Sequence, residues 1–169
     1  MSKFSIVITT RNRAEALTTL LPEVLNLQYP NVEVVLVDNA SEDHTNRVAG
    51  TFPVKYIYFP GGLAEARHIG SMAASGDFLT YVDDDCRPGK PDILRQIEAA
   101  FQKNTDAGIV GSRIENVGFK GMQQFKGYTR FGRNALLEFE PDPPSADVFA
   151  SMAITIRKDV YLKVGGFDP

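Results

Sequence analysis

The chain has 169 residues, of which 43% are hydrophobic and 23% charged, and its formal net charge at neutral pH is -3. This length predicts a single domain with a core of its own, and the composition is that of an ordinary soluble protein. A net negative charge argues against a nucleic-acid-binding protein, which would need a basic surface. The single cysteine, Cys86, excludes an internal disulfide, and only two histidines accompany it, which disfavours a zinc site.

No apolar stretch is long enough to span a bilayer, and residues 4–9 are too short for a cleavable signal. The lone cysteine suits a reducing compartment. We therefore expect a cytoplasmic protein with no membrane span in this chain. Peripheral association with the inner face of the membrane stays open.

Apolar, β-branched runs alternate with segments of helical periodicity along most of the chain. The predicted strands are residues 4–9, 32–37, 55–59, 78–82, 109–111 and 148–156. The first predicted helix follows a turn at residues 10–13, and the second follows a turn at residues 39–45. The other three predicted helices cover residues 63–75, 91–103 and 158–164. This alternation predicts an α/β fold with a largely parallel sheet covered by helices on both faces.

Several residues are typical of helix ends. Asn12, with Glu15 three positions later, favours a cap on the first helix, and Ser41 favours a cap on the second, with Asp43 a further helix-start residue. Pro22 should kink or divide the first helix. Gly76 is expected to end the helix over residues 63–75, and the glycine pair 165–166 the last helix. Gly61 and Gly62 would let an anion approach a helix start, although two glycines are a weak signal.

Three consecutive carboxylates, Asp83, Asp84 and Asp85, follow the apolar strand at residues 78–82. Side chains alternate along an extended chain, so we expect Asp83 and Asp85 to point one way and Asp84 the other. Mg2+ or Mn2+ between Asp83 and Asp85 would relieve their repulsion, because these cations prefer oxygen ligands. The commoner explanation of an isolated acidic pair is a solvated loop or a helix cap.

Ligands of parallel sheets bind beyond the carboxyl ends of the strands. This rule places Thr10, Arg11, Asp38 and the three aspartates along one rim. From residue 112 to 147 the pattern gives way to glycine, aromatic and basic residues, which suit either a substrate loop or a solvated surface. We expect one domain over residues 1–169, with a nucleotide-binding half at 1–111 and an incomplete acceptor-side half at 112–169.

Five short motifs occur in a recognisable order. They are Ile-Thr-Thr-Arg-Asn-Arg at 8–13, Val-Asp-Asn-Ala-Ser-Glu-Asp-His-Thr at 37–45, Ala-Arg-His-Ile-Gly at 66–70, Val-Asp-Asp-Asp at 82–85 and Gly-Gly-Phe-Asp at 165–168. Together they resemble family 2 glycosyltransferases of the GT-A fold, a Rossmann-like three-layer sandwich with a mostly parallel central sheet. Each motif alone is a weak signal.

The resemblance implies a metal-assisted, inverting transfer of a sugar from a nucleotide-diphosphate donor, by family habit a UDP-sugar, to a hydroxyl of a saccharide, lipid-linked or protein acceptor. It also implies roles for individual residues. Thr10 and Arg11 would flank the nucleotide, Asp38 would bind the base, Arg67 would approach the ribose or diphosphate, Asp83 and Asp84 would contact the ribose or the metal, and Asp83 and Asp85 would hold Mg2+ or Mn2+.

The chain departs from the family pattern at three places. Arg11 stands where an aromatic residue is common, and His68 where asparagine is common, so we expect His68 to be structural or a minor contact. Family members usually continue from Gly-Gly-Phe-Asp to an acidic pair that includes the general base. This chain stops at Pro169, so we leave the base unassigned, do not promote Asp168, and expect a donor side without a finished acceptor side.

Alternatives remain both for single residues and for the function of the whole chain. Thr10 could simply end a strand, Asp38 could cap the following turn, and Arg67 could pair with a nearby carboxylate. The whole chain could be a non-catalytic nucleotide-sugar-binding module. A phosphoacceptor receiver domain fits poorly, because the first strand ends in Thr-Thr-Arg-Asn and lacks the acidic pair that such a domain needs.

Overall fold

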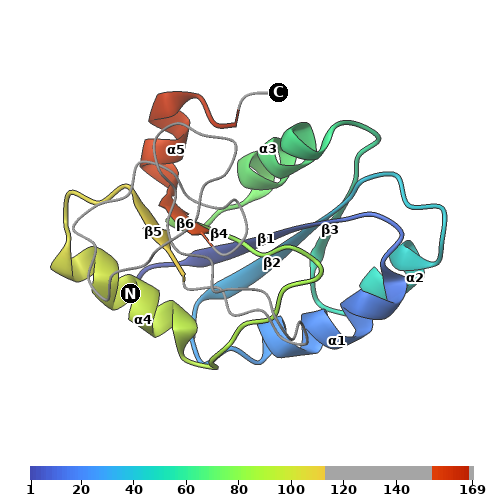
Figure 1. Ribbon diagram of the computed structural model, residues 1–169, viewed down its shortest axis with the longest axis horizontal. Coiled ribbons are helices and arrows are strands. Elements are labelled where there is room, and N and C mark those ends of the chain that lie inside the picture. The colour runs from blue at the N-terminus through green and yellow to red at the C-terminus, as the bar shows by residue number, and fades with distance from the viewer. Residues whose placement is uncertain (113–153, 168–169) are drawn as a thin grey trace, which may run out of the picture.

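Strand β1 (Phe4–Thr10) lies in the middle of a six-stranded sheet in the computed structural model, which describes residues 1–112 and 154–167. The other strands are β2 (Val32–Asp38), β3 (Lys55–Tyr58), β4 (Phe78–Tyr81), β5 (Ile109–Gly111) and β6 (Ile154–Arg157). The helices are α1 (Ala14–Leu25), α2 (Thr45–Ala49), α3 (Leu63–Ala73), α4 (Ile93–Lys103) and α5 (Lys158–Val164). Figure 1 shows the sheet with helices above and below it.

The strand order is β3-β2-β1-β4-β6-β5, and the first four of these strands are parallel to one another. β6 runs antiparallel to both β4 and β5. Thr10 pairs with Asp38 at the end of the β1 and β2 register, so the carboxyl ends of these strands meet at one edge. The predicted mostly parallel α/β sheet is confirmed.

Two hydrophobic clusters fill the two sides of the sheet, because alternate residues of β1 face opposite ways. Phe4, Ile6 and Ile8 pack with the apolar faces of α1 and α4. Val7 packs on the other side with Ala66 of α3 and Tyr161 of α5. α3 and α5 therefore cover one face and α1, α2 and α4 the other, which gives the three layers expected (Figure 1).

The first two helices do not begin as predicted. α1 begins at Ala14, and Asn12 lies before it with a left-handed φ of 53°. Asn12 donates its backbone N–H to Ser41 Oγ at 2.8 Å and accepts from the Glu42 N–H at 2.7 Å. Asn12 and Ser41 therefore tie the loops after β1 and β2 together, and neither caps a helix.

Asp43 serves both helix starts. One carboxylate oxygen accepts from the Thr45 N–H at 2.9 Å and the other from the Ala14 N–H at 3.2 Å. Its predicted place at a helix start is thus confirmed. α1 continues through Pro22 to Leu25, so the proline does not divide the helix.

Gly76 does not end α3, because the helix stops at Ala73 and is followed by an extended Ala74. A Cβ at position 76 would lie 2.7 Å from the backbone nitrogen of Ser5 and 2.8 Å from the carbonyl oxygen of Lys3. The glycine is needed for close approach to β1. The prediction for α5 is confirmed, since Gly165 and Gly166 follow it with φ values of 89° and 88°.

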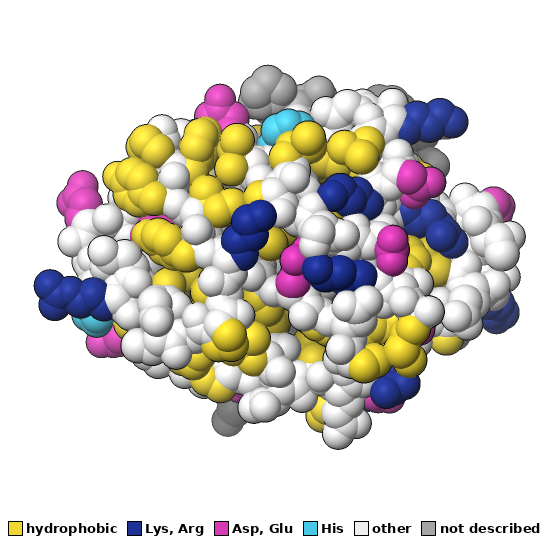
Figure 2. Space-filling model, turned by 180° about the vertical axis from the view of Figure 1, so that it is seen from behind, with side chains coloured by type: hydrophobic (Ala, Val, Ile, Leu, Met, Phe, Trp, Pro, Cys, Tyr) yellow, Lys and Arg dark blue, Asp and Glu magenta, His cyan; other side chains and the backbone are white. Residues whose placement is uncertain are grey.

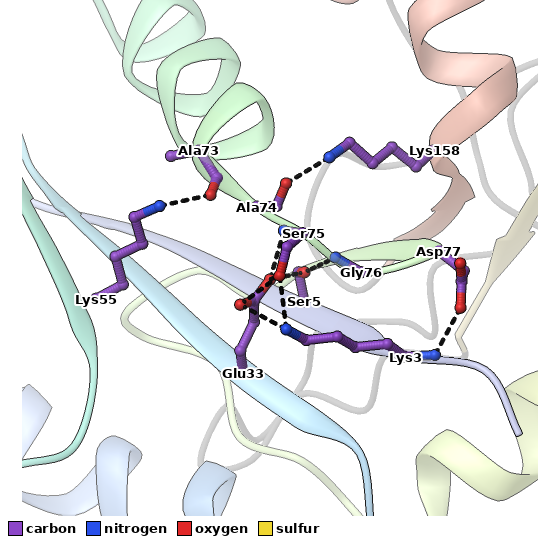
Figure 3. A network of polar contacts seen from close by, with 10 residues as sticks. All are labelled: Lys3, Ser5, Glu33, Lys55, Ala73, Ala74, Ser75, Gly76, Asp77 and Lys158. Carbon is purple, nitrogen blue, oxygen red and sulfur yellow. Dashed lines mark hydrogen bonds and ion pairs between the residues drawn. The ribbon is translucent and has the colours of Figure 1, made fainter.

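A polar network lies at the amino ends of β1 and β2, opposite the edge where ligands are expected (Figure 3). Glu33 accepts hydrogen bonds from Lys3 Nζ at 3.0 Å, from Ser75 Oγ at 2.9 Å and from Ser5 Oγ. Lys55 donates to the Ala73 carbonyl at 2.7 Å, and Lys158 donates to the Ala74 carbonyl. Cations thus meet the last carbonyls of α3, where the helix dipole is negative.

Two surface properties complete the fold. The face drawn in Figure 2 carries basic side chains interleaved with acidic ones near its middle, so this face presents no continuous basic area. None of the helices in the described ranges is both long and apolar enough to cross a membrane.

The predicted strand at 148–156 is seen as β6 from residue 154 on. The first part of that predicted strand and the basic segment at 113–147 lie outside the described residues.

Candidate functional site

An open pocket of about 240 Å³ lies at the carboxyl ends of β1, β2 and β4, beside the first turns of α3. Its lining residues are Thr9, Thr10, Arg11, Asn39, Leu63, Arg67, Asp83, Asp84 and Asp85. The structure thus brings together every predicted site residue except Asp38. This is the edge at which parallel sheets bind ligands.

The acidic run forms a turn rather than a continuation of the strand. β4 ends at Tyr81, and the Cys86 N–H donates to the Asp83 carbonyl at 2.9 Å. Asp83 and Asp84 contact different elements, α3 and β1, as the predicted alternation requires, and the shared direction of Asp83 and Asp85 stays a prediction. All three residues of the acidic turn line the same pocket.

Asp83 faces α3. Its Oδ1 atom lies 2.6 Å from Nη2 of Arg67, and the two side chains are 23% and 13% exposed. The ion pair that the sequence left as the alternative for Arg67 is therefore present. Because the pair lines the pocket, the guanidinium lies beside the acidic turn where a ligand anion would enter.

Asp84 faces β1 instead. Thr10, which is 3% exposed, donates from Oγ1 to Asp84 Oδ2 at 2.8 Å, and Arg13 Nε lies 3.9 Å from Oδ1. Burial raises the pKa of Asp84 above its usual value, and the hydrogen bond from Thr10 and the charge of Arg13 offset only part of this rise. Thr10 thus fixes an acid that is more readily protonated than an ordinary aspartate.

Asp85 is the third acid of the turn. Cys86 donates from Sγ to Asp85 Oδ1 at 3.7 Å. Burial, followed by the charges of Asp85 and Asp83, raises the pKa of Cys86 to about 11. The thiol therefore stays protonated at neutral pH, which does not suit a nucleophile.

Asp38 is buried, with 1% of its surface exposed, and does not line the pocket. Its two carboxylate oxygens accept from the Ser41 N–H at 2.8 Å and from the Tyr56 hydroxyl at 2.7 Å. These bonds include the turn-capping contact considered as an alternative. The contact of Asp38 with the nucleobase stays a prediction.

Asn39 lines the pocket and was not singled out from the sequence. The signal available was its place directly after the strand that ends at Asp38. Nearby, Glu65 accepts from the Gly62 N–H at 2.7 Å, so a carboxylate of the protein already lies at the start of α3. This bond occupies the Gly62 N–H, and the anion approach suggested for Gly61 and Gly62 stays a prediction.

Metal binding by protein side chains alone finds little support in the described ranges. No group of three or more histidine, cysteine, aspartate or glutamate side chains there is arranged to hold an ion. Asp83 and Asp85 nevertheless line the same pocket, which leaves two carboxylates to share an ion with a ligand.

Comparison with known proteins decides the family. Residues 5–163 match the model described as glycosyl transferase family 2. This chain belongs to glycosyl transferase family 2. The resemblance carried by the five motifs is confirmed, and the motifs at 8–13, 37–45, 66–70 and 82–85 contribute residues to the pocket.

Comparisons with individual proteins agree with this assignment. The dolichol-phosphate mannosyltransferase of Pyrococcus furiosus is 29% identical over 98% of this chain and 50% of its own length. The crystal structure of S. aureus TarS 1-349 in complex with UDP-GlcNAc superimposes with a TM-score of 0.76 at 21% identity, over 99% of this chain and 48% of that one. The mannosyltransferase PcManGT from Pyrobaculum calidifontis, in complex with GDP-Man and Mn2+, gives 0.71 at 19% identity over 99% and 48%.

The two superpositions confirm the GT-A fold for this family 2 chain. Nearly all of this chain is matched, but it spans only about half the length of these curated relatives.

A second pocket lies on the other side of α3, between that helix and the segment after α5. His68 Nδ1 and the Tyr161 hydroxyl are hydrogen-bonded there at 2.9 Å. Phe167 packs edge-on against both Tyr161 and Tyr81. Adjacent residues of α3 thus reach two places, since Arg67 faces the acidic turn and His68 faces α5.

Proposed function

We propose that this chain binds a nucleoside-diphosphate sugar and forms the donor side of a glycosyltransferase. The observation that carries the proposal is the pocket in which Arg67 and three carboxylates of one turn meet at the carboxyl edge of the sheet. A donor of this kind carries two phosphates, which Arg67 would bind directly. Family membership supports the reaction class.

The carboxylates require a cation before they can accept a diphosphate. We propose that Asp83 and Asp85 hold Mg2+ or Mn2+, with phosphate oxygens and water completing the ligands. When bound, the ion would neutralise the charge that develops on the departing diphosphate. The Mn2+ in the PcManGT complex supports this choice of metal.

The proposed reaction is an inverting displacement. The oxygen of an acceptor hydroxyl forms a bond to the anomeric carbon, the bond to the diphosphate oxygen breaks with its electron pair, and a general base takes the hydroxyl proton. No described residue is assigned as that base, and Asp168 lies outside the described residues. The acceptor would be a saccharide, a lipid-linked saccharide or a protein.

Two further proposals concern the whole chain. We keep the division into a nucleotide-binding part at 1–111 and an acceptor-side part at 112–169. The pocket residues all fall in the first part, which supports this division.

The proposed location is cytoplasmic, with peripheral association at the inner face of the membrane. The single cysteine fits a reducing compartment.

Calorimetric titration with UDP tests the donor site. The parent chain should bind UDP in the presence of Mn2+ and lose most of this affinity when the metal is chelated. Asp85→Ala should weaken binding with Mn2+ by at least about tenfold, because one of two protein ligands is lost. Without metal, the variant should bind UDP no more weakly than the parent, because a carboxylate that repels the diphosphate is gone.

Asp106→Ala is the matched control. Asp106 is an exposed aspartate outside the pocket lining, so the same loss of charge there should leave UDP binding unchanged. Binding of UDP that is equally tight with and without metal, and in Asp85→Ala, would contradict the metal assignment. No binding of UDP or any other nucleoside diphosphate by the parent would contradict the donor site.

A further inference from the structure

One residue of the pocket is placed to distinguish one nucleobase from another. Its role as a specificity-determining residue rests on the proposed donor site. The candidate is Asn39, the first residue after β2, which is 9% exposed and lines the pocket.

Two contacts fix Asn39. Its backbone N–H donates to the Thr10 carbonyl at 2.8 Å, which anchors it beside the end of β1. Its side-chain oxygen accepts from the Gly61 N–H at 3.3 Å. Because a backbone N–H can only donate, the side-chain atom facing Gly61 must be the oxygen. The amide group of Asn39 therefore faces the other way.

That amide group donates no hydrogen bond within the described part of the chain, although nine-tenths of the residue is buried. Among the described residues, the only fully enclosed side-chain polar atom without a partner is Thr45 Oγ1, so the Asn39 amide nitrogen is accessible to solvent. Because the residue lines the pocket, this accessible donor is available to a ligand acceptor. Asn39 thus offers two N–H donors to whatever occupies this end of the pocket.

The strand order shows which part of a nucleotide would lie there. β1 separates β2 from β4, so Asn39 and the acidic turn are about two strand spacings, or roughly 10 Å, apart. A diphosphate beside Asp85 would leave the ribose over Thr10 and the base near Asn39. Leu63, which is 52% exposed and lines the same pocket, gives a base an apolar surface to lie against.

We propose that Asn39 selects the base by donating from Nδ2 to its carbonyl oxygen. That acceptor is O4 of uracil or O6 of guanine, whereas cytosine and adenine carry an amino donor at the same place. An amide donor facing an amino group leaves both unpaired, which weakens binding. The pocket should therefore prefer UDP over CDP, and GDP over ADP.

Asn39→Asp gives a sharp test, because aspartate keeps an oxygen for the Gly61 N–H and replaces the amide donor with a second acceptor. The added charge should weaken the binding of every nucleoside diphosphate, so the informative quantity is the ratio of the UDP and CDP affinities. We expect the parent with Mn2+ to favour UDP over CDP by about tenfold, the effect of one hydrogen bond. In the variant this ratio should fall to one or reverse, because cytosine can donate to the carboxylate.

The outcomes separate this inference from the donor site itself. A parent that binds UDP and CDP equally well would overturn the role of Asn39 and leave the donor site standing. So would a variant that keeps the parent's ratio. A parent that binds no nucleoside diphosphate would overturn both. The parent's own ratio needs no variant, so the test survives even if Asn39→Asp fails to fold, which thermal unfolding would reveal.

Discussion

At the scale of single residues, Gly76 has a steric role that the local sequence does not reveal. Because it follows a helical segment, the sequence pattern suggests a helix terminator. The structure instead places it against the backbone of Ser5 and Lys3, two residues far away in the chain. A close approach between distant segments leaves no local pattern.

Gly76→Ala should therefore destabilise the protein. Its methyl group would lie within 2.8 Å of backbone atoms that belong to β1 and the residue before it. Overpacking of this kind costs about 1–3 kcal/mol. The free energy of unfolding, measured with urea, should fall by that amount.

Gly89→Ala is the control for this change. No atom lies within 4 Å of the place where its Cβ would stand, so its unfolding free energy should stay within about 0.5 kcal/mol of the parent's. If Gly76→Ala proved as stable as Gly89→Ala, the close packing described for position 76 would be wrong.

Residue types predicted much of the candidate site. Thr10, Arg11, Arg67 and the three aspartates are polar residues next to strand ends or in family motifs, and all line the pocket. Asp38 has the same signal but is buried beneath Tyr56 and Ser41. Burial of a strand-end carboxylate depends on its neighbours in space, and here one of them comes from β3.

At the scale of elements, the Glu33 network joins the start of β1, the start of β2 and the residues after α3 (Figure 3). Burial alone would raise the pKa of Glu33. Hydrogen bonds from Ser5, Ser75 and Lys3 outweigh burial and lower the pKa from 4.5 to about 2. The charged carboxylate therefore stabilises the folded chain.

This stabilisation should depend on pH. Since the carboxyl titrates near 4.5 when unfolded, its contribution is fully present above that pH and is lost as the pH falls from about 4.5 to about 2. At pH 7, Glu33→Gln should lower the free energy of unfolding by about 2 kcal/mol. Urea unfolding at pH 7 and pH 3 should show the gap between parent and variant narrowing at the lower pH.

Glu42→Gln serves as the reference, because Glu42 is exposed and its carboxylate makes no hydrogen bond or ion pair with the described residues. Its unfolding free energy should match the parent's at both pH values. A gap for Glu33→Gln that is the same at pH 7 and pH 3 would argue against the carboxylate as its source.

Elements were easier to predict than their ends. Runs of β-branched residues and the spacing of leucines in α1 follow from burial on one face, so strands and helices could be placed from the sequence. The start of α1 could not, because the group that accepts from Ala14 is Asp43, in another loop. Local capping patterns suggested Asn12 and Ser41, which bind each other's loops instead.

At the scale of the whole molecule, α5 is joined to α3 by the pair formed by His68 and Tyr161. Tyr161 is 2% exposed, and its hydroxyl bonds His68 Nδ1. Tyr161→Phe should lower the free energy of unfolding by about 1 kcal/mol, because the imidazole loses a partner in a largely buried place. Hydrogen exchange at the Gly166 amide, which bonds the Tyr161 carbonyl, should become faster.

Tyr58→Phe removes the same hydroxyl from a side chain that is 58% exposed. Neither its unfolding free energy nor the exchange of Gly166 should change. Equal behaviour of the two variants would mean that the His68 contact does not hold the segment after α5 in place.

The order of the strands also bears on how the chain is made. β4 pairs on one side with β1, which is synthesised early, and on its other side with β6, which begins only at residue 154. While the ribosome is still adding the intervening residues, β4 exposes an unpaired edge of an otherwise assembled parallel sheet. Such an edge can pair with another chain, so the growing polypeptide passes through a stage at which it depends on dilution or chaperones to stay unassociated.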